Sequence, residues 1–457
     1  MKLGDHKVKI LALLVSLNLI RGLIYSAVVP LWQAPDEPWH FEHVKLFYQK
    51  RGPVSWADRS PELQKKIIAS MEEFGYWKFL PWAQKEDIKT GELHQLPLYY
   101  LVSASVLLFT EQRDLATQAY AVRFVSVLMG TTVVLLAYLS ARTLFPNDIF
   151  LQIGIPGFII FLPMHTHITS SINNDNLAEL MTSLTIYLLT LILSRGLSLA
   201  RIAALSLCLL LGFYTKRTFF FTTPIVLLAF ICLVRIKPVK LIPLQKLTVI
   251  TCVISVIVGM IVLWRGGFLL RWWNRIYYRL TYTRAYPSPL RMFEALRGLY
   301  LQYAEYIFKS FWAFFGWLTV ELDPAWYGFP LAICLASLVG LFLLGFRITK
   351  GLAPFASWQK AVILLYVLSA FLILLLTIST FLIYEVEESF GWWAKGHMPQ
   401  GRYLFSAIIP IATILMLGIR EILPSRYRLQ LLILCLTGFF LFDLLCLLKY
   451  IIPFFYG

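Results

Sequence analysis

Two adjacent carboxylates follow directly after the first long apolar segment of the chain. Asp36 and Glu37 stand between Pro35 and Pro38, and the two prolines keep both carboxylates out of the interior of a regular helix. A carboxylate at a membrane surface can act as a general base that accepts the proton of a hydroxyl group. The same sequence also fits an exit turn in which Asp36 caps the following helix. Asp36, with Glu37 as its companion, is the first catalytic candidate, and a helix cap is the alternative.

A second polar segment, residues 170–176, separates two apolar runs with the sequence Ser-Ser-Ile-Asn-Asn-Asp-Asn. Its carboxylate, Asp175, is a third catalytic candidate, and a cluster of helix N-cap residues is the alternative. The topology derived below puts this segment and Asp36 on the same side of the membrane. That shared side favours a function for both carboxylates.

Cations predicted on the same side could hold a phosphate group. Arginine suits phosphate because its planar guanidinium can bind two oxygens at once, and lysine adds a compact charge. The alternatives are snorkelling at a helix end for a Lys-Arg pair, interfacial anchoring for an arginine that opens an apolar run, and simple solvation for a histidine in a loop. The candidates for phosphate binding are Lys216, Arg217, Arg402 and His397.

A basic segment between residues 265 and 309 repeats arginine at every fourth position. Arg271, Arg275 and Arg279 would form a stripe on one helix face, with tryptophan and tyrosine residues between them. Such a stripe can rest on anionic headgroups, or it can contact a phosphate-bearing lipid or an acidic acceptor. We expect it to bind lipid or acceptor.

The elements that carry these residues must lie in a membrane. Apolar residues make up 59% of the chain and charged residues only 14%, against roughly 45–50% and about 25% in soluble domains. The net charge of +16 is explained by lysine and arginine that orient membrane spans, so no nucleic-acid partner is expected. The six cysteines stand singly within apolar runs, without metal-ligand spacing, and are expected to serve packing.

Eleven apolar segments are long enough, or nearly so, to cross a bilayer, which takes about 17 to 25 helical residues. A further apolar stretch, 97–110, has 14 residues and is expected not to cross. With a cytoplasmic N-terminus, the four basic loops that begin near residues 195, 235, 347 and 420 then all face the cytoplasm, as the positive-inside rule requires. The predicted spans lie near 8–30, 119–144, 150–168, 177–195, 199–214, 219–235, 247–264, 328–346, 360–383, 402–419 and 429–450.

The sequence therefore predicts an all-α polytopic membrane protein with a single membrane domain over residues 1–457. Juxtamembrane helices are expected in the first outer loop, because 61–73 is charged and amphipathic and tryptophans around it favour the headgroup level. The outer segments are 31–118, a basic loop at 265–327, and 384–401; the spans before and after the basic loop fall within 8–264 and 328–457.

Six short motifs on the predicted outer side, in this order along the chain, resemble the GT-C superfamily of membrane glycosyltransferases. Relatives in that superfamily include protein O-mannosyltransferases and aminoarabinose transferases, and the combination resembles a bacterial family of predicted membrane proteins placed there. The motifs are Pro-Asp-Glu-Pro-Trp-His-Phe at 35–41, His-Gln-Leu-Pro-Leu-Tyr-Tyr at 94–100, Ser-Ile-Asn-Asn-Asp at 171–175, Thr-Lys-Arg-Thr at 215–218, Ser-Phe-Trp-Ala-Phe-Phe-Gly-Trp-Leu at 310–318 and Gln-Gly-Arg-Tyr-Leu at 400–404.

The resemblance implies a GT-C type helical bundle, with residues 8–264 as its main module. It implies that Asp36 is the catalytic base and that Asp175 assists it. His94 and Tyr99, from the second motif, are expected to contact acceptor or lipid. Asn174-Asp175-Asn176 replaces the Asp-Asn-Glu of metal-dependent oligosaccharyltransferases, and this departure argues against a divalent metal.

We therefore expect an inverting glycosyltransferase of the inner (cytoplasmic) membrane, with its active site on the outer face. Its donor would be a polyprenyl-phosphate sugar, and its acceptor a glycan, a lipid or a protein. One alternative is a flippase or transporter of lipid-linked sugars, which should carry ionisable groups near the bilayer midplane or an internal repeat. Arg21 and Arg123 come nearest to such groups, although either could pair with a carboxylate of the site. A polysaccharide polymerase or ligase is the other alternative.

Overall fold

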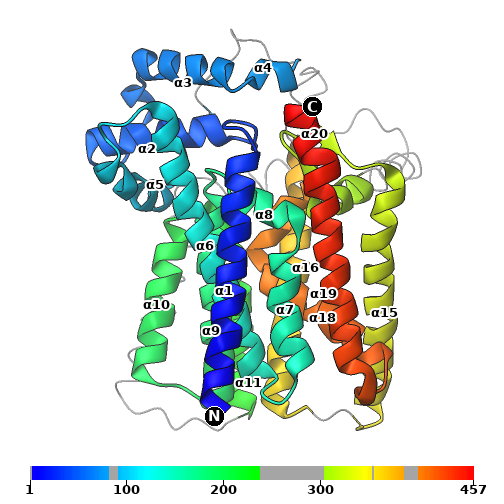
Figure 1. Cartoon of the computed structure of the whole chain (residues 1–457). Helices are drawn as coiled ribbons and strands as arrows, with labels where there is room; N and C mark the ends of the chain where they lie inside the picture. Colours follow the sequence, from blue (N-terminus) through cyan, green and yellow to red (C-terminus); the bar gives the residue numbers. More distant parts are fainter. Residues whose placement is uncertain (1–2, 82–90, 237–302, 353–354, 385–399) are drawn as a thin grey trace, which may run out of the picture.

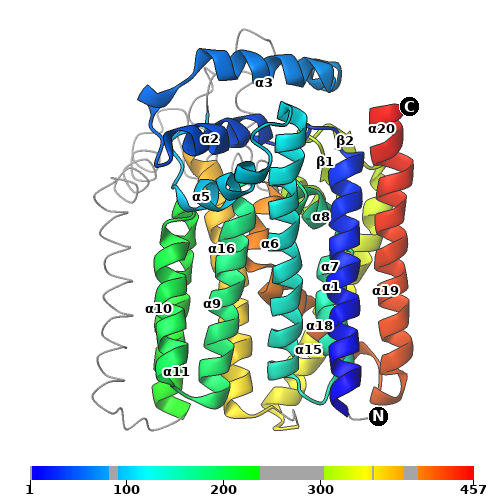
Figure 2. The ribbon, with the colours of Figure 1, turned by 60° about the vertical axis from the view of Figure 1, so that its left-hand side comes forward.

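The computed structural model describes residues 3–81, 91–236, 303–352, 355–384 and 400–457, and most of these residues are helical. Long helices run in alternating directions and form one bundle, and the two chain termini lie at opposite ends of it (Figure 1). The short helices of the first outer loop lie at the end where the C-terminus lies (Figure 2). We call this end of the bundle the site end, and the opposite end, where α1 begins, the basic end.

Eight helices of the described residues are long and apolar enough to cross a membrane, and a bent pair adds a ninth. A tenth, α10, is apolar but shorter. The prediction of an all-α polytopic membrane protein is thus confirmed; the predicted span at 247–264 lies outside the described residues. The bundle helices are α1 (Leu3–Val28), α6 (Leu115–Leu144), α7 (Ile149–Ile160) with α8 (Pro163–Thr169), α9 (Asp175–Arg195), α10 (Leu199–Phe213), α11 (Thr222–Ile236), α15 (Gly328–Thr349), α16 (Ser357–Tyr384), α18 (Ile408–Ile422) and α19 (Arg428–Leu445).

One predicted span, 150–168, is broken in the structure. Helices α7 and α8 meet at an angle of 62°. The break falls just before Pro163, which lacks an amide hydrogen and begins α8 at a position where that hydrogen would be unpaired in any case. Helix α7 starts near the basic end, and α8 lies beyond the bend, toward the site end (Figure 1).

Small residues let α15 and α18 approach each other closely. A side chain at Gly340 would collide with the backbone of Gly418, and one at Gly418 would collide with Ser337. Close backbone approach at small residues is the usual way in which helices associate in lipid, where apolar side chains gain little by leaving the solvent. The opposite face of α15 carries exposed apolar side chains, among them Leu338 and Phe342.

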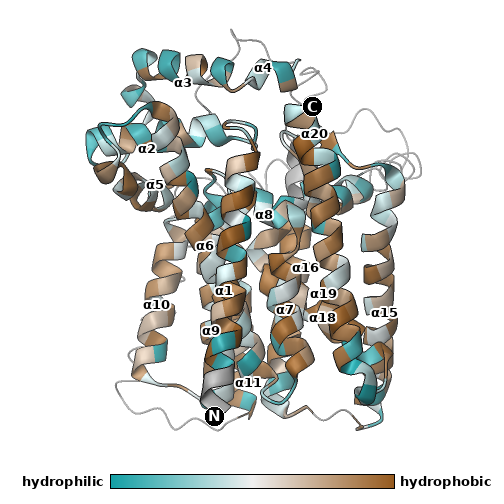
Figure 3. Ribbon diagram, in the orientation of Figure 1, coloured by the Kyte–Doolittle hydropathy of each residue, from teal (hydrophilic) through white to brown (hydrophobic). Residues whose placement is uncertain are grey.

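Hydrophobic residues predominate along the long helices in the middle of the bundle, and hydrophilic residues are more frequent at its two ends (Figure 3). This is the distribution expected of a bundle surrounded by lipid. The basic end holds the loops that were predicted to be cytoplasmic, as the ends of α9, α11, α15 and α18 show (Figure 1). Their described cations are Arg195, Arg201, Arg235, Arg347, Lys350, Lys360, Arg420, Arg426 and Arg428.

The first outer loop forms a second hydrophobic core at the site end. Four helices of this loop contribute to it together with residues of α6 and α9: α2 (Glu37–Lys50), α3 (Pro61–Glu73), α4 (Tyr76–Phe79) and α5 (Leu98–Ala104). The predicted amphipathic helix 61–73 is α3, which buries Leu63, Ile67 and Met71 in this core. It therefore packs on other helices of the loop with its apolar face.

The stretch 97–110 forms α5 and a following 3-10 turn, Ser105–Phe109. Twelve helical residues extend only about 18 Å at 1.5 Å per residue, too little for a hydrocarbon layer of about 30 Å. This length agrees with the prediction that the stretch does not cross the membrane.

A small hairpin and the C-terminal helix close the site end. Strands β1 (Phe314–Phe315) and β2 (Val320–Glu321) pair antiparallel. Between them, Trp317 donates a hydrogen bond to the carbonyl oxygen of Trp32 at 2.9 Å and packs edge-on against Trp39. Helix α19 continues through a π-helical turn (Cys446–Ile451) into α20 (Ile452–Tyr456), where Phe455 packs against Phe79.

Candidate active site

Asp36 immediately precedes α2, yet it does not cap that helix. Its backbone is left-handed, with φ of 66°, and its carboxylate makes no hydrogen bond to the first turn of α2. Such a conformation is uncommon for a residue with a side chain and is concentrated at functional sites. Its Oδ2 atom accepts a hydrogen bond from Arg402 Nη2 at 2.8 Å. The carboxylate keeps 30% of its surface exposed, so it remains open to a ligand.

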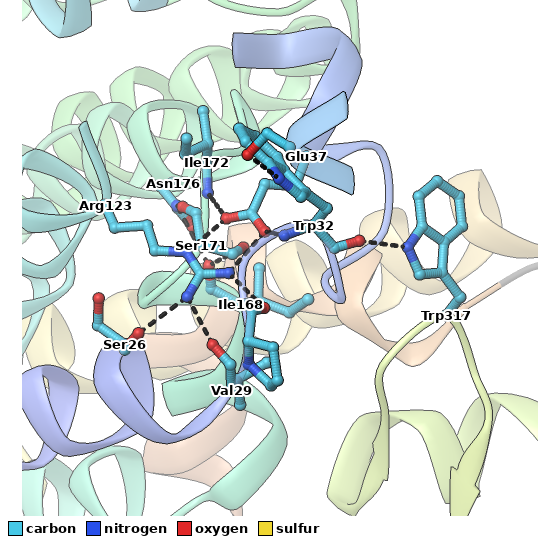
Figure 4. A network of polar contacts seen from close by, with 12 residues as sticks. Ser26, Val29, Trp32, Glu37, Arg123, Ile168, Ser171, Ile172, Asn176 and Trp317 are labelled. Carbon is cyan, nitrogen blue, oxygen red and sulfur yellow. Dashed lines mark hydrogen bonds and ion pairs between the residues drawn. The ribbon is translucent and has the colours of Figure 1, made fainter. Parts of the chain in front are cut away.

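Glu37 has a different environment from its neighbour. Its side chain is fully buried, and its two oxygens accept hydrogen bonds from Nε and Nη2 of Arg123, both at 2.7 Å. The backbone amides of Trp32 and Ile172 donate to the same carboxylate at 2.9 and 3.1 Å (Figure 4). Because these four bonds occupy the carboxylate, Glu37 is not open to an acceptor hydroxyl, and the expected catalytic companion is instead a structural residue.

Arg123 makes further hydrogen bonds besides its ion pair with Glu37, and we call this pair the Glu37–Arg123 brace. Its remaining hydrogens are donated to the carbonyl oxygens of Ser26, Val29 and Pro30 at 2.7 to 2.9 Å (Figure 4). These carbonyls belong to the end of α1 and the turn after it, where a helix leaves acceptors without intrahelical partners. The Glu37–Arg123 pair therefore ties the end of α1, α6 and two outer loops together and fixes the backbone on which Asp36 sits.

Asp175 is the first residue of α9, and its carboxylate, like that of Asp36, does not cap the helix that follows. The side chain of Asn173 accepts the hydrogen bond from the Asp175 amide at 2.9 Å, so local capping is provided by a neighbour. The Asp175 carboxylate forms an ion pair with Lys216, which lies between α10 and the 3-10 turn Arg217–Phe221. Since Lys216 points to this carboxylate, it does not snorkel into solvent as a simple helix-end cation would.

Arg402 is held in place by the glycine before it. The Gly401 amide donates a hydrogen bond to Ser310 Oγ at 2.7 Å, and a side chain at Gly401 would collide with the backbone at Ile307 and Phe311. Only glycine therefore allows this loop to lie on the helical residues 303–312. The Arg402 side chain is 4% exposed, which rules out a simple interfacial anchor.

Asp36, Asp175, Lys216 and Arg402 form one group of alternating charge, which we call the charge cluster. Arg402 lies within electrostatic range of both carboxylates, and Lys216 is near the ring of Tyr403 on which Arg402 also lies. The guanidinium uses only Nη2 for Asp36; its Nε and Nη1 atoms have no partner among the described residues. These two buried guanidinium nitrogens are therefore free to donate hydrogen bonds to an anion.

The second motif borders the charge cluster. Gln95 accepts a hydrogen bond from the Asn174 side chain at 3.2 Å, which joins the first outer loop to the start of α9. Desolvation and the nearby charges of Arg217 and Lys216 lower the pKa of His94. His94 thus lies beside the phosphate-binding candidates. Burial likewise lowers the pKa of His40, which shares a 2.8 Å hydrogen bond with the hydroxyl of Tyr100.

The structure does not bring Tyr99 to the charge cluster. Tyr99 is 0% exposed, and its hydroxyl lies 3.4 Å from that of Ser126 in the second core. The prediction that Tyr99 contacts acceptor or lipid is therefore wrong, because its ring is inside the protein. His397, Arg271, Arg275 and Arg279 lie outside the described residues.

The donor set does not fit a divalent metal. In the part of the chain that the structure describes, there is no group of three or more His, Cys, Asp or Glu side chains that could hold one. The two carboxylates of the charge cluster each face a cation, Arg402 or Lys216. A dication placed between them would be repelled by both positive charges.

Two polar residues near the charge cluster gave no signal in the sequence. Gln33 and His167 are 0% and 2% exposed, and every polar atom of both side chains lacks a partner among the described residues. Neither residue belongs to one of the six motifs. An isolated glutamine or histidine next to an apolar run does not by itself predict a functional site. Only the fold shows that both side chains are buried without partners among the described residues.

Structures of an archaeal oligosaccharyltransferase are among the solved structures that are similar to this chain. No protein-family model and no curated protein sequence matches the chain. The apo structure of the Archaeoglobus fulgidus oligosaccharyltransferase is similar over 98% of this chain and 55% of that chain, with 11% sequence identity and a TM-score of 0.49. The structure of the same enzyme tethered to an acceptor peptide with an NVT sequon is similar over 97% of this chain and 54% of that chain. The sequence identity is 12% and the TM-score is 0.46. The chain spans about half the length of that enzyme.

Proposed function

We propose that this protein is a GT-C type glycosyltransferase that moves a sugar from a polyprenyl-phosphate donor to an acceptor hydroxyl. One observation carries the proposal: a partly exposed aspartate, Asp36, is hydrogen-bonded to a buried arginine, Arg402, that keeps two further N–H-bearing atoms free. A general base and an anion-binding group thus lie in direct contact. The sequence motifs that resemble the GT-C superfamily contribute both residues.

Asp36 acts as the base. As the acceptor oxygen attacks the anomeric carbon, its proton passes to Asp36, and the bond from that carbon to the phosphate oxygen breaks. A single displacement of this kind inverts the anomeric configuration. Glu37 takes no part in the proton transfer, because its oxygens are occupied by Arg123 and two backbone amides.

Arg402 and Lys216 stabilise the leaving phosphate. Preorganised cations aimed at developing negative charge are worth more in a water-poor site than in solution. Arg402 can hold the phosphate through Nε and Nη1 while Nη2 keeps Asp36 in position, so one guanidinium couples base and leaving group. Lys216 is held by Asp175 within the same cluster. Arg217 and His397 remain candidates for contacts farther along the phosphate.

The site is proposed to face the outer side of the membrane. The basic loops lie at the opposite end of the bundle, and short loops rich in lysine and arginine stay in the cytoplasm. An enzyme with this orientation uses a lipid-linked sugar, since soluble nucleotide sugars are made in the cytoplasm. The acceptor is a glycan, a lipid or a protein that reaches the outer face.

Buried ion pairs favour a flippase as the second candidate. Arg21 binds Asp443 inside the bundle, and His165 contacts Glu179 at 2.7 Å. Intramembrane charges often mark transport pathways. However, Asp443 also accepts a hydrogen bond from Tyr25, and Arg21 donates to Thr166, so these groups satisfy one another across α1, α8 and α19. This pairing fits a role in holding the helices together better than a role in a transport pathway.

Reconstituted protein distinguishes the two candidates. Proteoliposomes would receive polyprenyl phosphates that carry radiolabelled sugars, together with glycan, lipid and peptide acceptors. A transferase releases polyprenyl phosphate and forms an equal amount of product with inverted configuration, as mass spectrometry and NMR would show. A flippase leaves the sugar on its lipid and changes only its exposure to an impermeant glycosidase, and this result would overturn the proposal.

A further inference from the structure

Two buried side chains next to the charge cluster have no hydrogen-bond partner at all within the described residues. Both amide atoms of Gln33 and both ring nitrogens of His167 are unpaired, although the side chains are 0% and 2% exposed. Native proteins pair nearly all buried polar groups, because an unpaired one costs folding free energy. Two such residues in this region therefore need an explanation.

The two residues belong to different elements, and both lie beside the hairpin of β1 and β2. Gln33 lies three residues before Asp36, whose carboxylate binds Arg402. His167, on α8, packs edge-on against Phe315 with ring centroids 5.7 Å apart, and the next residue, Gly316, lies against the backbone oxygen of Gln33. His167 is also within electrostatic range of Arg402 and Arg123.

Poor packing of the region as a whole does not explain the unpaired atoms. On the same short helix, His165 contacts Glu179 at 2.7 Å, and Thr166 and Thr169 donate to backbone carbonyls. Glu37 and Arg123 are fully paired as well. Much of the local structure thus satisfies its polar groups, although single atoms of His165, Asn176, Thr319 and Gln400 also lack a partner among the described residues. Gln33 and His167 differ from these four residues because each has two polar side-chain atoms and both are unpaired.

The chemistry of the unpaired atoms selects a class of ligand. A glutamine amide and a neutral imidazole each offer both a donor and an acceptor, as a sugar hydroxyl does. Arg402 offers only donors and a positive charge, which suit a phosphate. A ligand with a phosphate joined to an uncharged hydroxylated ring matches both the cation and the two uncharged side chains. Neither Gln33 nor His167 supplies a charge that would pair with an ammonium or a carboxylate on the ring.

We infer that Gln33 and His167 form the subsite for the sugar of the donor, and that this sugar is a neutral one recognised through its hydroxyls. This inference rests on the proposed function and specifies its substrate. The two residues bind and position the sugar; they do not take part in proton transfer. Donors whose ring carries an ammonium or a carboxylate should be poor ligands.

The test compares binding and transfer in purified wild type, Gln33→Leu and His167→Phe. Short-chain polyprenyl phosphates would carry glucose, mannose or galactose, the corresponding monodeoxy sugars, glucosamine or glucuronate, and the bare polyprenyl phosphate would be included. Wild type should prefer a neutral hexose over its deoxy analogue at one ring position by tenfold or more in kcat/KM. Each variant should lose this preference while it binds bare polyprenyl phosphate normally.

Thermal stability separates a ligand subsite from a structural role. Because both substitutions remove unpaired polar atoms from a buried place, the melting temperature should stay the same or rise. His167→Gln, which keeps a donor and an acceptor, should recover part of the hydroxyl preference. Ser206→Ala, which removes an unpaired hydroxyl from α10, is the matched control and should leave sugar preference unchanged.

The outcomes are distinguishable. Transfer by wild type with the same hydroxyl preference in both variants would mean that Gln33 and His167 only hold water, and this inference would fail while the proposed function stood. A wild-type preference for glucosamine or glucuronate would also overturn it. No transfer from any donor would defeat the proposed function itself.

Discussion

In the proposed function, binding and catalysis both depend on Arg402, because its guanidinium contacts Asp36 and has two further buried nitrogen atoms without a partner among the described residues. Arg402→Ala should weaken donor binding by about 2–5 kcal/mol, the range for losing one partner of a buried charge pair. Arg402→Lys should also bind more weakly, since an ammonium cannot reach an aspartate and a phosphate with the same planar fork. Equilibrium binding of a radiolabelled polyprenyl-phosphate sugar measures both effects.

Arg426→Ala is the control for that experiment, because it removes an exposed arginine at the basic end. Its donor affinity should match wild type. If Arg402→Ala bound donor equally well, Arg402 would be reduced to a structural partner of Asp36.

Lys216 supplies the second positive charge of the cluster, and we propose that it takes the electrostatic role that a metal has in metal-dependent enzymes. Transfer by wild type should therefore be unaffected by EDTA. Lys216→Met should lower kcat by about 10²–10³-fold, the cost of removing one preorganised stabiliser of developing negative charge. Loss of activity in EDTA with recovery on adding a divalent cation would show that a metal, and not Lys216, carries this charge.

The candidate site was partly predictable at the level of single residues. Asp36, Asp175, Lys216 and Arg402 stand out because charges are rare beside apolar runs. Their pairing did not follow from the sequence, since the Asp36–Arg402 contact joins residues 366 positions apart.

The adjacent carboxylates could not be told apart either. Glu37 looks like Asp36 in the sequence, and only its burial against Arg123 shows that its role is structural. Gln33 and His167 carry no charge or motif, so their unpaired atoms emerge only from the packing.

The Glu37–Arg123 brace belongs to the scale of elements, because it joins α1, α2, α6 and the segment before α9. Glu37→Gln should destabilise the protein by about 3–5 kcal/mol, since it leaves a buried guanidinium without its counter-charge. Thermal unfolding of the purified protein measures the change. Asp114→Asn alters a carboxylate in the same way at an exposed cap of α6, where asparagine caps equally well, and should leave the melting temperature unchanged.

A normal melting temperature for Glu37→Gln together with lost transfer would contradict the structural role and return Glu37 to the chemistry. The comparison with Asp36 is informative here, because the two neighbours receive the same kind of substitution. We expect one to lose activity and the other to lose stability.

Hydropathy predicted the elements well wherever a helix simply crosses the membrane. Helices α6, α9 and α16 begin and end within a few residues of the expected spans. The break at Pro163 was missed, because an apolar sequence continues through it and only the geometry reveals the bend. The bounds of α3 matched, but its packing on other loop helices depends on contacts with Leu63, Ile67 and Met71 that hydropathy does not encode.

At the scale of the whole molecule, orientation decides which substrates can reach the site. The basic end should face the cytoplasm and the site end the outside. Gln112→Cys, in the exposed turn before α6, should react with an impermeant maleimide added to intact cells. Ser425→Cys, between α18 and α19 at the basic end, should react only after the membrane is opened.

Labelling of Gln112→Cys only from the cytoplasmic side would reverse this topology and would place the charge cluster where nucleotide sugars are available. The wild-type chain is the background for both variants, and its described cysteines lie within the bundle, half-buried or buried. Any reaction above that background therefore comes from the introduced residue.

The most direct test of the account is sugar transfer by Asp36→Asn. Asparagine keeps the shape and can still accept the hydrogen bond from Arg402, but it cannot take up the proton of the acceptor hydroxyl. Transfer should fall by about 10²–10⁴-fold, while donor affinity and melting temperature stay close to wild type and Asp114→Asn remains fully active. Full transfer activity in purified Asp36→Asn, with donor binding intact, would contradict the assignment of Asp36 as the catalytic base.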